Sequence, residues 1–304
     1  MSGQGLRVGV DIGGTKTEAV LVDAAGSVRN TLRIPTGWGA DEVVASAIAA
    51  VTGVAGDALA AIESIGVGIP GTVDATSGVV SHAMNLGVER LELGSTLAQH
   101  FGMPVRVEND VNAAALGAFH LTAQPVTASI AYLNLGTGLA AGLVLRGELW
   151  RGARGAAGEI GHVLVDPAGP LDLDGQRGGL EVVASGSGIA RQWAQGSDNA
   201  VTAVLDAADA GDERALEIRQ RLFDGVAASV RILVLTVDVD SVIIGGGLAG
   251  LGPRLMDGVS AVIASWEAQS PFIASLDLRG RLQLVPAGTP VAALGAAHLG
   301  SLDG

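Results

Sequence analysis

Two short glycine–threonine loops are the clearest chemical feature of this chain. The first lies within Asp11–Thr17 and the second is Gly136-Thr137-Gly138, and each follows an apolar strand. Glycine has no Cβ, so the backbone N–H groups of such loops can approach an anion closely, and the threonine hydroxyl adds a donor. One such loop could be an ordinary hairpin turn. Two in one chain suggest a pair of clamps facing one polyphosphate, which is the chemistry of an ATP-using enzyme.

The first loop carries one carboxylate and the only lysine of the chain. Asp11 ends the first apolar strand, beside Gly13, Gly14, Thr15 and Lys16. A carboxylate next to an anion site is unfavourable unless a cation lies between them, so we expect Mg²⁺ near Asp11, held through water. The alternative is an Asp that caps its own turn. Lys16 could face either a phosphate or solvent.

Asp110 is the candidate general base. The apolar stretch Val105–Val107 predicts a buried strand that delivers Glu108-Asn109-Asp110 at its carboxyl end, ahead of a helix over 111–120. A kinase needs phosphate positioning, a metal ion and one carboxylate that accepts the proton of the attacking hydroxyl. Asn109-Asp110 is also typical of a helix N-cap, so capping and catalysis can divide between the two residues.

A third glycine run, Gly245-Gly246-Gly247, begins a G-x-G-x-x-G pattern after an apolar strand. With Glu267 at the distance expected of a ribose-binding acid, the pattern allows a dinucleotide site. A Rossmann domain usually starts with this element, whereas here it follows two other glycine loops. We therefore interpret it as a strand-to-helix turn against the adenosine end of a nucleotide.

The elements that position these loops follow a pattern that occurs twice. Hydrophobic periodicity predicts three strands, then helices alternating with strands, in each half of the chain. Such a repeat implies two α/β domains with a ligand cleft between them, outside the carboxyl ends of the strands. The predicted strands are Leu6–Val10, Glu18–Val22, Val28–Ile34, Ser64–Ile69, Ser129–Leu135, Gly142–Leu145, one that starts with Gly147–Trp150, Ser241–Ile244 and Leu282–Val285. The predicted helices are Asp41–Gly53 with Asp41 as its cap, Leu91–Phe101, Ala215–Val237, one from Pro253, and Val291–Leu299.

Composition excludes several classes of function. The 304 residues carry a net charge of −13 and no cysteine, which excludes disulfides and thiolate metal sites and argues against nucleic acid as a partner. The sequence shows no secretory leader and no long uncharged apolar run, so we expect a soluble cytoplasmic protein that does not span a membrane.

The most specific string is Gly155–His162, which ends in Gly-Glu-Ile-Gly-His, followed by Asp172–Glu181. With the loops above, Pro70–Asp74 and Glu108–Ala115, it gives the chain a resemblance to the ROK family of sugar kinases and sugar-responsive repressors over essentially its whole length. The resemblance implies a two-domain actin-like, ribonuclease-H-like ATPase fold that binds ATP and a hexose in the interdomain cleft. We expect an N-terminal domain over 1–118 joined by a C-terminal helix at about 290–304, and a C-terminal domain over 119–289.

The resemblance also implies site residues and a reaction. It makes Asp110 the general base, and sugar contacts would come from Asn85, Asn109, Asp110, Glu159, His162 and Glu181. We expect ATP-dependent phosphorylation of the 6-hydroxyl of a hexose, with glucose first, and a homodimer. The alternatives are a kinase for N-acetylglucosamine or N-acetylmannosamine, or a sugar-binding protein without catalysis; polyphosphate in place of ATP also stays open. A repressor is not expected, because the phosphate loop begins at residue 11 with no helix-turn-helix before it.

The chain departs from the family in its zinc loop. Many members carry three cysteines that bind zinc together with the histidine, and here those positions are Asp172, Asp174 and Gly179. We therefore expect no structural zinc, and we expect Asp172 or Asp174 to orient His162 through a hydrogen bond. A second departure is Gly87, where members often have proline followed soon by tryptophan.

Overall fold

The computed structural model describes residues 5–172, 175–194, 199–286 and 288–299. The chain forms two compact units. Unit 1 draws on 1–126, 147–157 and 288–304, and unit 2 on 127–146 and 158–287. Unit 1 also includes residues 119–126 and 147–157, which were predicted to belong to the C-terminal domain. The first of these differences has a simple cause: the predicted boundary at 118 falls inside a helix.

Unit 1 is built on a five-stranded sheet in the order β3-β2-β1-β4-β8. The first three strands form an antiparallel meander, and the last two lie parallel to β1. One row of this sheet pairs Asp11 with Gly68, and Gly68 in turn with Glu108. The strands are β1 (Leu6–Ile12), β2 (Lys16–Val22), β3 (Val28–Pro35), β4 (Ile62–Ile69) and β8 (Val105–Asn109).

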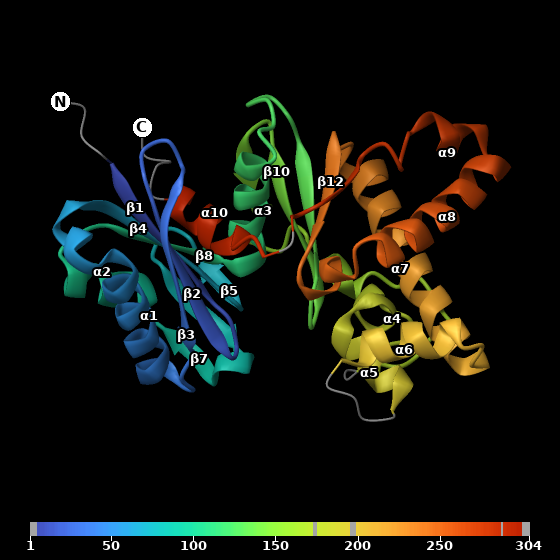
Figure 1. The fold of residues 1–304 in the computed structure, drawn as a ribbon, viewed down its shortest axis with the longest axis horizontal. Coiled ribbons are helices and arrows are strands. Elements are labelled where there is room, and N and C mark those ends of the chain that lie inside the picture. Colours follow the sequence, from blue (N-terminus) through green and yellow to red (C-terminus); the bar gives the residue numbers. More distant parts are fainter. Residues whose placement is uncertain (1–4, 173–174, 195–198, 287, 300–304) are drawn as a thin grey trace. The chain divides into compact units, whose positions relative to one another are not determined.

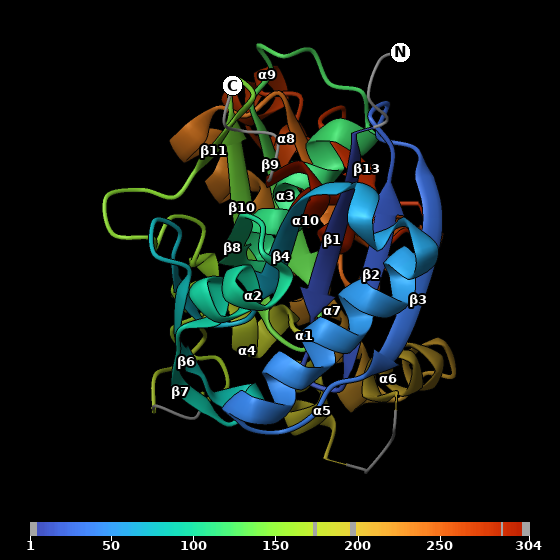
Figure 2. The same cartoon turned by 90° about the vertical axis from the view of Figure 1, so that its left-hand side faces the viewer.

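Helices cover both faces of this sheet, because its strands are apolar on both sides. The helix α1 (Ala40–Ala55) lies across β1, β2 and β3 (Figure 2) and packs with Val8, Val10 and Leu21. The opposite face carries α10 (Val291–Leu299), which packs on Val20 and Val22. Alternation along β2 therefore sends successive side chains to different helices.

The C-terminal helix α10 approaches the sheet closely, because the strand residues beneath it lack side chains. A Cβ on Gly9 or Gly66 would collide with the backbone oxygens of Ala293 or Ala296. Beside α10 lies α3 (Asp110–Leu121), and the two helices share a buried cluster. The chain's last helix thus completes the unit that its first strand begins (Figure 1).

The segment Ala40–Ala61, which includes α1, is the one stretch of the described residues long and apolar enough to cross a membrane by length and composition. Its most apolar stretch of 18 residues has a mean hydropathy of 1.8. Val43, Ala47, Val51 and Val54 are nevertheless buried in the core of unit 1. The helix α1 is therefore apolar because it packs in the core of unit 1.

Unit 2 repeats the topology of unit 1. Its sheet has the order β11-β10-β9-β12-β13, with β10 antiparallel to β9 and with β12 and β13 parallel. The repeat confirms the predicted duplication. The strands are β9 (Ile130–Leu135), β10 (Leu139–Leu145), β11 (Glu148–Trp150, drawn from unit 1), β12 (Ser241–Gly245) and β13 (Leu282–Leu284).

The remaining elements include several that the sequence patterns did not predict. A small sheet in the order β5-β6-β7 precedes α2, and three consecutive helices, α4 to α6, lie before the long α7. The bounds are β5 (Thr72–Asp74), β6 (Val79–Ala83), β7 (Val88–Leu91), α2 (Leu93–Phe101), α4 (Leu180–Ala184), α5 (Gly186–Trp193), α6 (Ala200–Asp209), α7 (Glu213–Val237), α8 (Pro253–Gln269) and α9 (Pro271–Ser275), with 3₁₀ turns η1 (Gly56–Ala61), η2 (Met84–Leu86), η3 (Ile160–His162) and η4 (Gly247–Leu251).

The predicted long elements appear within a few residues of their expected bounds, but the predicted cap of α1 is wrong. The helix begins at Ala40, so Gly39 occupies the N-cap position and Asp41 lies in the first turn. An acidic residue there still favours the helix, because its charge opposes the positive end of the helix dipole.

Candidate active site

The first glycine–threonine loop is the turn of the β1–β2 hairpin. The Gly13 N–H donates to the Lys16 carbonyl at 2.9 Å, and the Thr36 N–H donates to the Thr15 carbonyl at 3.1 Å. Gly14, Thr15 and Lys16 are exposed. The loop is therefore held by backbone bonds at its base, while its tip is free to contact a ligand. The hairpin geometry and an anion-binding role are compatible.

Asp11 and Asp110 lie close enough to interact electrostatically. Gly68 stands beside Asp11 in the sheet, and a Cβ on Gly68 would lie 3.5 Å from the Asp110 Cα. Burial, then the Asp110 charge, then the Glu18 charge raise the pKa of Asp11 to about 7, against a smaller opposing effect of Lys16. Two carboxylates thus converge beside the first loop. Such a pair calls for a cation, because like charges this close raise each other's energy.

Asn109 is the N-cap of α3, and its side chain is largely occupied. Its Oδ1 accepts from the Val111 N–H at 2.9 Å and from the Asn112 N–H at 3.2 Å. Its Nδ2 donates to the Gly71 carbonyl at 3.2 Å. The cap therefore falls to Asn109, and one N–H of its amide stays available for a ligand. This division leaves Asp110 as the acidic residue of the first helical turn.

An ion pair with a buried carboxylate supports this corner, and the sequence patterns did not reveal it. Glu108 is buried, and its Oε2 accepts from the Arg151 Nε at 2.6 Å. Its Oε1 accepts from the Asn109 N–H and from the Asn112 Nδ2, both at 3.0 Å. The carboxylate thus ties the end of β8 to the first turn of α3, which fixes the residues on either side of Asp110. The sequence signal that could have indicated this role of Glu108 is its position at the end of a predicted buried strand.

Asn85 lies against the first loop. A Cβ on Gly14 would meet the Asn85 Nδ2 at 3.4 Å, so this predicted sugar contact and the predicted phosphate loop are neighbours within unit 1. Next to Asn85, Gly87 has a positive φ of 67°, and the indole of Trp38 occupies the space that a Cβ there would need. Trp38 comes from a distant loop and is 69% exposed. The sequence patterns did not single it out.

The second loop, in unit 2, is anchored to the corner between α4 and α5. The Gly136 N–H donates to the Gly138 carbonyl at 3.0 Å, and the Gly186 N–H donates to the Gly136 carbonyl at 2.8 Å. The Ser187 N–H donates to the Thr137 carbonyl at 3.1 Å. These bonds hold the loop from behind and leave the Thr137 side of the turn exposed.

Glu181 belongs to the same cluster as the second loop. Its Oε2 accepts from the Leu139 N–H at 3.1 Å, and a Cβ on Gly138 would lie only 2.7 Å from that oxygen. A larger residue at position 138 would have to shift this carboxylate. Glu159 is the N-cap of the turn η3 and His162 is its last residue, and both are exposed.

Nothing in the described residues supports the predicted hydrogen bond from Asp172 to His162. The Asp172 Oδ1 instead accepts from the Gln176 N–H at 2.7 Å, which closes its own turn. Asp174 lies outside the described residues, and Gly179 is the buried residue that precedes α4. No group of three His, Asp or Glu side chains suited to a metal ion occurs within the described part of the chain.

The third glycine run is explained in part by packing. Gly245 ends the buried strand β12, and the Tyr132 ring fills the space of its missing Cβ. Gly246 and Gly247 are exposed, so they are the two that could face a nucleotide. The alternative interpretation as a dinucleotide site needs Glu267 as the ribose-binding acid, but Glu267 forms an ion pair with Arg279 at 2.7 Å. A 3₁₀ turn rather than an α-helix follows the glycines.

The comparisons with known proteins agree with this architecture. The model of the ROK family matches residues 7–300. This chain is a member of the ROK family. It is 32% identical over 271 residues to a glucokinase of Halalkalibacterium halodurans, covering 82% of each chain, and 32% identical over 273 residues to an N-acetylmannosamine kinase of Escherichia coli O127:H6, covering 88% of this chain and 90% of that one.

Solved structures of the family give the fold. A ROK family glucokinase from Streptomyces griseus, solved in complex with glucose and AMPPNP, has a TM-score of 0.77 and 31% identity, covering 97% of this chain and 99% of that one. The actin-like, ribonuclease-H-like ATPase fold predicted for this chain is thereby confirmed, and the duplicated sheet is its signature.

Proposed function

We propose that this protein is an ATP-dependent sugar kinase that phosphorylates the 6-hydroxyl of a hexose, with glucose as the first candidate. The observation that carries the proposal is the placement of Asp110. It begins α3, next to Asp11 and to the hairpin loop Gly13–Lys16. A carboxylate that can take a proton beside an anion-binding loop is the minimal requirement of hydroxyl-to-phosphate transfer.

The roles of the other residues follow from their chemistry. Asp110 accepts the proton of the attacking hydroxyl, and Glu108 with Arg151 holds the start of α3 in place. Asn85, Asn109, Glu159, His162 and Glu181 supply the amide, carboxylate and imidazole groups that sugar hydroxyls need as donors and acceptors. The exposed tip of the first loop and the Thr137 turn of the second bind the phosphates of ATP through backbone N–H groups.

The residues at Asp11 fit a magnesium ion. The raised pKa of Asp11 reflects burial and the nearby charges of Asp110 and Glu18, which Lys16 offsets only in part, and a divalent cation bound through water would offset them further. When bound, Mg²⁺ neutralises phosphate charge during the transfer. The backbone of both loops likewise fits the close approach of nucleotide phosphates, because Gly14 and Thr137 are exposed and the glycines beside them are partly exposed.

A second candidate function is the phosphorylation of N-acetylmannosamine or N-acetylglucosamine. It is favoured by the N-acetylmannosamine kinase relative, which is as similar to this chain as the glucokinase relative is. The second candidate requires that the site admit an N-acetyl group at the 2-position of the sugar, and N-acetylmannosamine also has the opposite configuration to glucose at that carbon.

A panel of sugars measured by coupled ADP release tests the proposal. Glucose, mannose, N-acetylglucosamine and N-acetylmannosamine are compared at equal concentration with ATP and Mg²⁺, and again with polyphosphate as donor. We expect turnover of glucose with ATP, and a 6-phosphate product by NMR. A higher kcat/KM for an N-acetylhexosamine would select the second candidate. No turnover of any of these sugars with either donor would refute the kinase proposal.

A further inference from the structure

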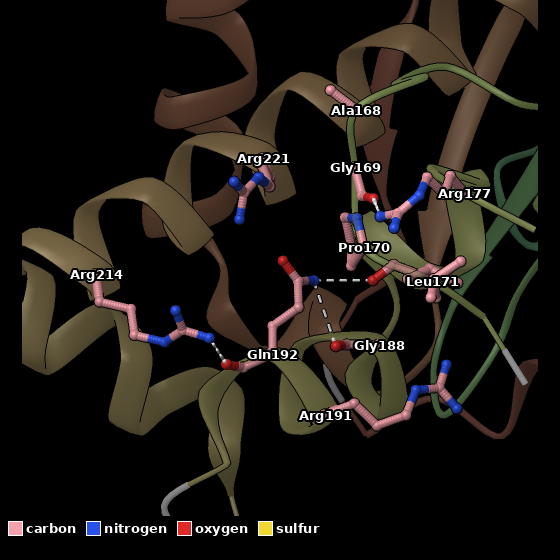
Figure 3. A pocket seen from close by; sticks show the side chains of 11 residues that line it. Ala168, Gly169, Pro170, Leu171, Arg177, Gly188, Arg191, Gln192, Arg214 and Arg221 are labelled. Atoms are coloured by element: carbon pink, nitrogen blue, oxygen red, sulfur yellow. Dashed lines mark hydrogen bonds between the residues drawn. The ribbon is translucent and has the colours of Figure 1, made fainter. Parts of the chain in front are cut away.

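Unit 2 contains a cavity lined by four arginines that has no part in the proposed reaction. Its volume is about 390 Å³, within the range of small-molecule pockets. It lies between the loop 168–171, the helix α5 and the helix α7 (Figure 3). Among the described residues that line it there is no Asp or Glu, and the four arginines are Arg177, Arg191, Arg214 and Arg221.

Two of the four guanidinium groups in this arginine cavity are anchored by backbone carbonyls, which do not neutralise their charge. The Arg177 Nη1 donates to the Gly169 carbonyl at 3.2 Å, and the Arg214 Nη2 donates to the Gln192 carbonyl at 2.7 Å. Of the four, Arg221 alone has a carboxylate partner among the described residues, Glu217, at the long distance of 3.9 Å. Backbone carbonyls thus orient two of the cations, and each guanidinium keeps further N–H donors.

This clustering of four positive charges contrasts with the net charge of the whole chain, which is −13. A concave surface that gathers one sign of charge concentrates counter-ions of the opposite sign. Four cations around one cavity repel each other, and an anion placed among them relieves that repulsion. The electrostatics therefore call for an anionic occupant.

Gln192 adds a second, independent requirement. Its Nε2 donates to the Val182 carbonyl at 2.8 Å and to the Gly188 carbonyl at 3.3 Å, which fixes the orientation of the amide. Its Oε1 points the other way, into the space among the arginines (Figure 3), and has no hydrogen-bond partner in the described part of the chain. The side chain is 7% exposed, and this oxygen is closed to bulk water.

A buried acceptor without a donor is costly, so this oxygen calls for an occupant that carries a hydroxyl. The guanidinium forks call for an occupant that carries an anion, and their planar geometry suits the oxygens of a phosphate. A single ligand that meets both requirements has a phosphate group and at least one free hydroxyl.

We propose that the arginine cavity is a binding site for a phosphate monoester of a polyol, separate from the site of phosphoryl transfer. The phosphate lies among the guanidinium groups, and a ligand hydroxyl donates to the Gln192 Oε1 once it is seated in the cavity. The site does not depend on the proposed kinase function, since none of its lining residues is assigned to catalysis.

A short segment of the chain, from Val182 to Gly188, connects the cavity to the second glycine loop. Val182 and Gly188, which line the cavity, flank the corner at Ser185–Ser187 that holds Gly136 and Thr137. Glu181 directly precedes Val182. A ligand that orders this corner therefore bears on the loop and on Glu181, so we expect occupancy to change the affinity for nucleotide or sugar.

Calorimetric titration of the purified chain at pH 8 tests the site. The probes are glycerol 3-phosphate, inorganic phosphate, sulfate, citrate and glycerol. We expect glycerol 3-phosphate to bind most tightly, phosphate next, sulfate at least fivefold more weakly than phosphate because it has no hydroxyl, and glycerol not at all. Arg191→Ala and Arg221→Ala should each weaken glycerol 3-phosphate at least tenfold. The matched control is Arg279→Ala, which removes an exposed arginine outside the cavity and should change nothing.

Lys16→Met separates this site from the glycine loops. If Lys16→Met weakens glycerol 3-phosphate while Arg191→Ala and Arg221→Ala do not, the phosphate binds at the first loop and the proposal is overturned. Equal affinity for sulfate and phosphate would overturn the role of Gln192. Tighter binding of citrate than of glycerol 3-phosphate would overturn the phosphate assignment. If no probe binds at a concentration of about 10 mM, the site itself is overturned.

Discussion

Asp11 is expected to destabilise the folded protein at neutral pH, and Asp11→Asn should therefore stabilise it. The pKa of Asp11 is raised from 3.8 to about 7 by burial and by the neighbouring Asp110. The folded state then holds a proton that the unfolded state releases, so the stability present below pH 3.8 is lost as the pH rises to about 7. With about 1.4 kcal/mol per pKa unit, the full loss is about 4 kcal/mol, and the part lost between pH 5 and pH 8 is about 2.5 kcal/mol.

Urea denaturation of both proteins from pH 5 to pH 8, without nucleotide or Mg²⁺, measures this difference. The stability of Asp11→Asn relative to the wild-type chain should grow by about 2.5 kcal/mol over that range. Asp257→Asn, an exposed change on α8, is the control and should leave the profile unchanged. A stability difference that stays constant from pH 5 to pH 8 would refute the electrostatic reasoning. Mg²⁺ should reduce the difference, because it supplies the missing countercharge.

Two further predictions concern unit 1. The His298 ring stacks on the His120 ring, with 3.8 Å between their centroids, and burial, then His120, then Arg7 lower the pKa of His298 from 6.5 to about 3. The stability present above pH 6.5 is therefore lost as the pH falls towards 3, by about 2 kcal/mol at pH 5. His298→Leu should abolish this loss in urea titrations. Arg151→Met leaves the Glu108 carboxylate buried without its cation, so it should lower the free energy of unfolding by about 3 kcal/mol and reduce kcat. The double variant with Glu108→Gln should be more stable than Arg151→Met alone, and equal stability would contradict the role of the ion pair.

The two five-stranded sheets and the glycine loops could be predicted because they depend on local patterns. Alternating apolar residues in Leu6–Ile12 and a nearly continuous apolar run in Ile130–Leu135 mark the strands, and the glycines mark the turns that follow. The order of the motifs then identified the family. The sequence predicted that capping and catalysis can divide between Asn109 and Asp110, and the hydrogen bonds assign the cap of α3 to Asn109.

What the patterns missed depends on contacts between distant parts of the chain. Glu108 and Arg151 are 43 residues apart, and nothing local to either shows that they pair. Trp38 reaches Gly87 from another loop in the same way. The helices α4 and α5 were missed because glycines at 178, 179, 186 and 188 weaken the helical pattern, although tertiary packing buries both helices. The roles in sugar and nucleotide binding, the dimer and the cytoplasmic location stay predictions.

The most direct test of the account is the turnover of Asp110→Asn with ATP, Mg²⁺ and the sugar that the panel selects. Asparagine keeps the shape of the side chain but cannot accept the proton of the attacking hydroxyl. We expect kcat to fall by at least about two orders of magnitude, with a small change in the KM for sugar, while Asp257→Asn keeps the wild-type rate. A kcat within tenfold of the wild-type value would contradict the role of Asp110 as general base.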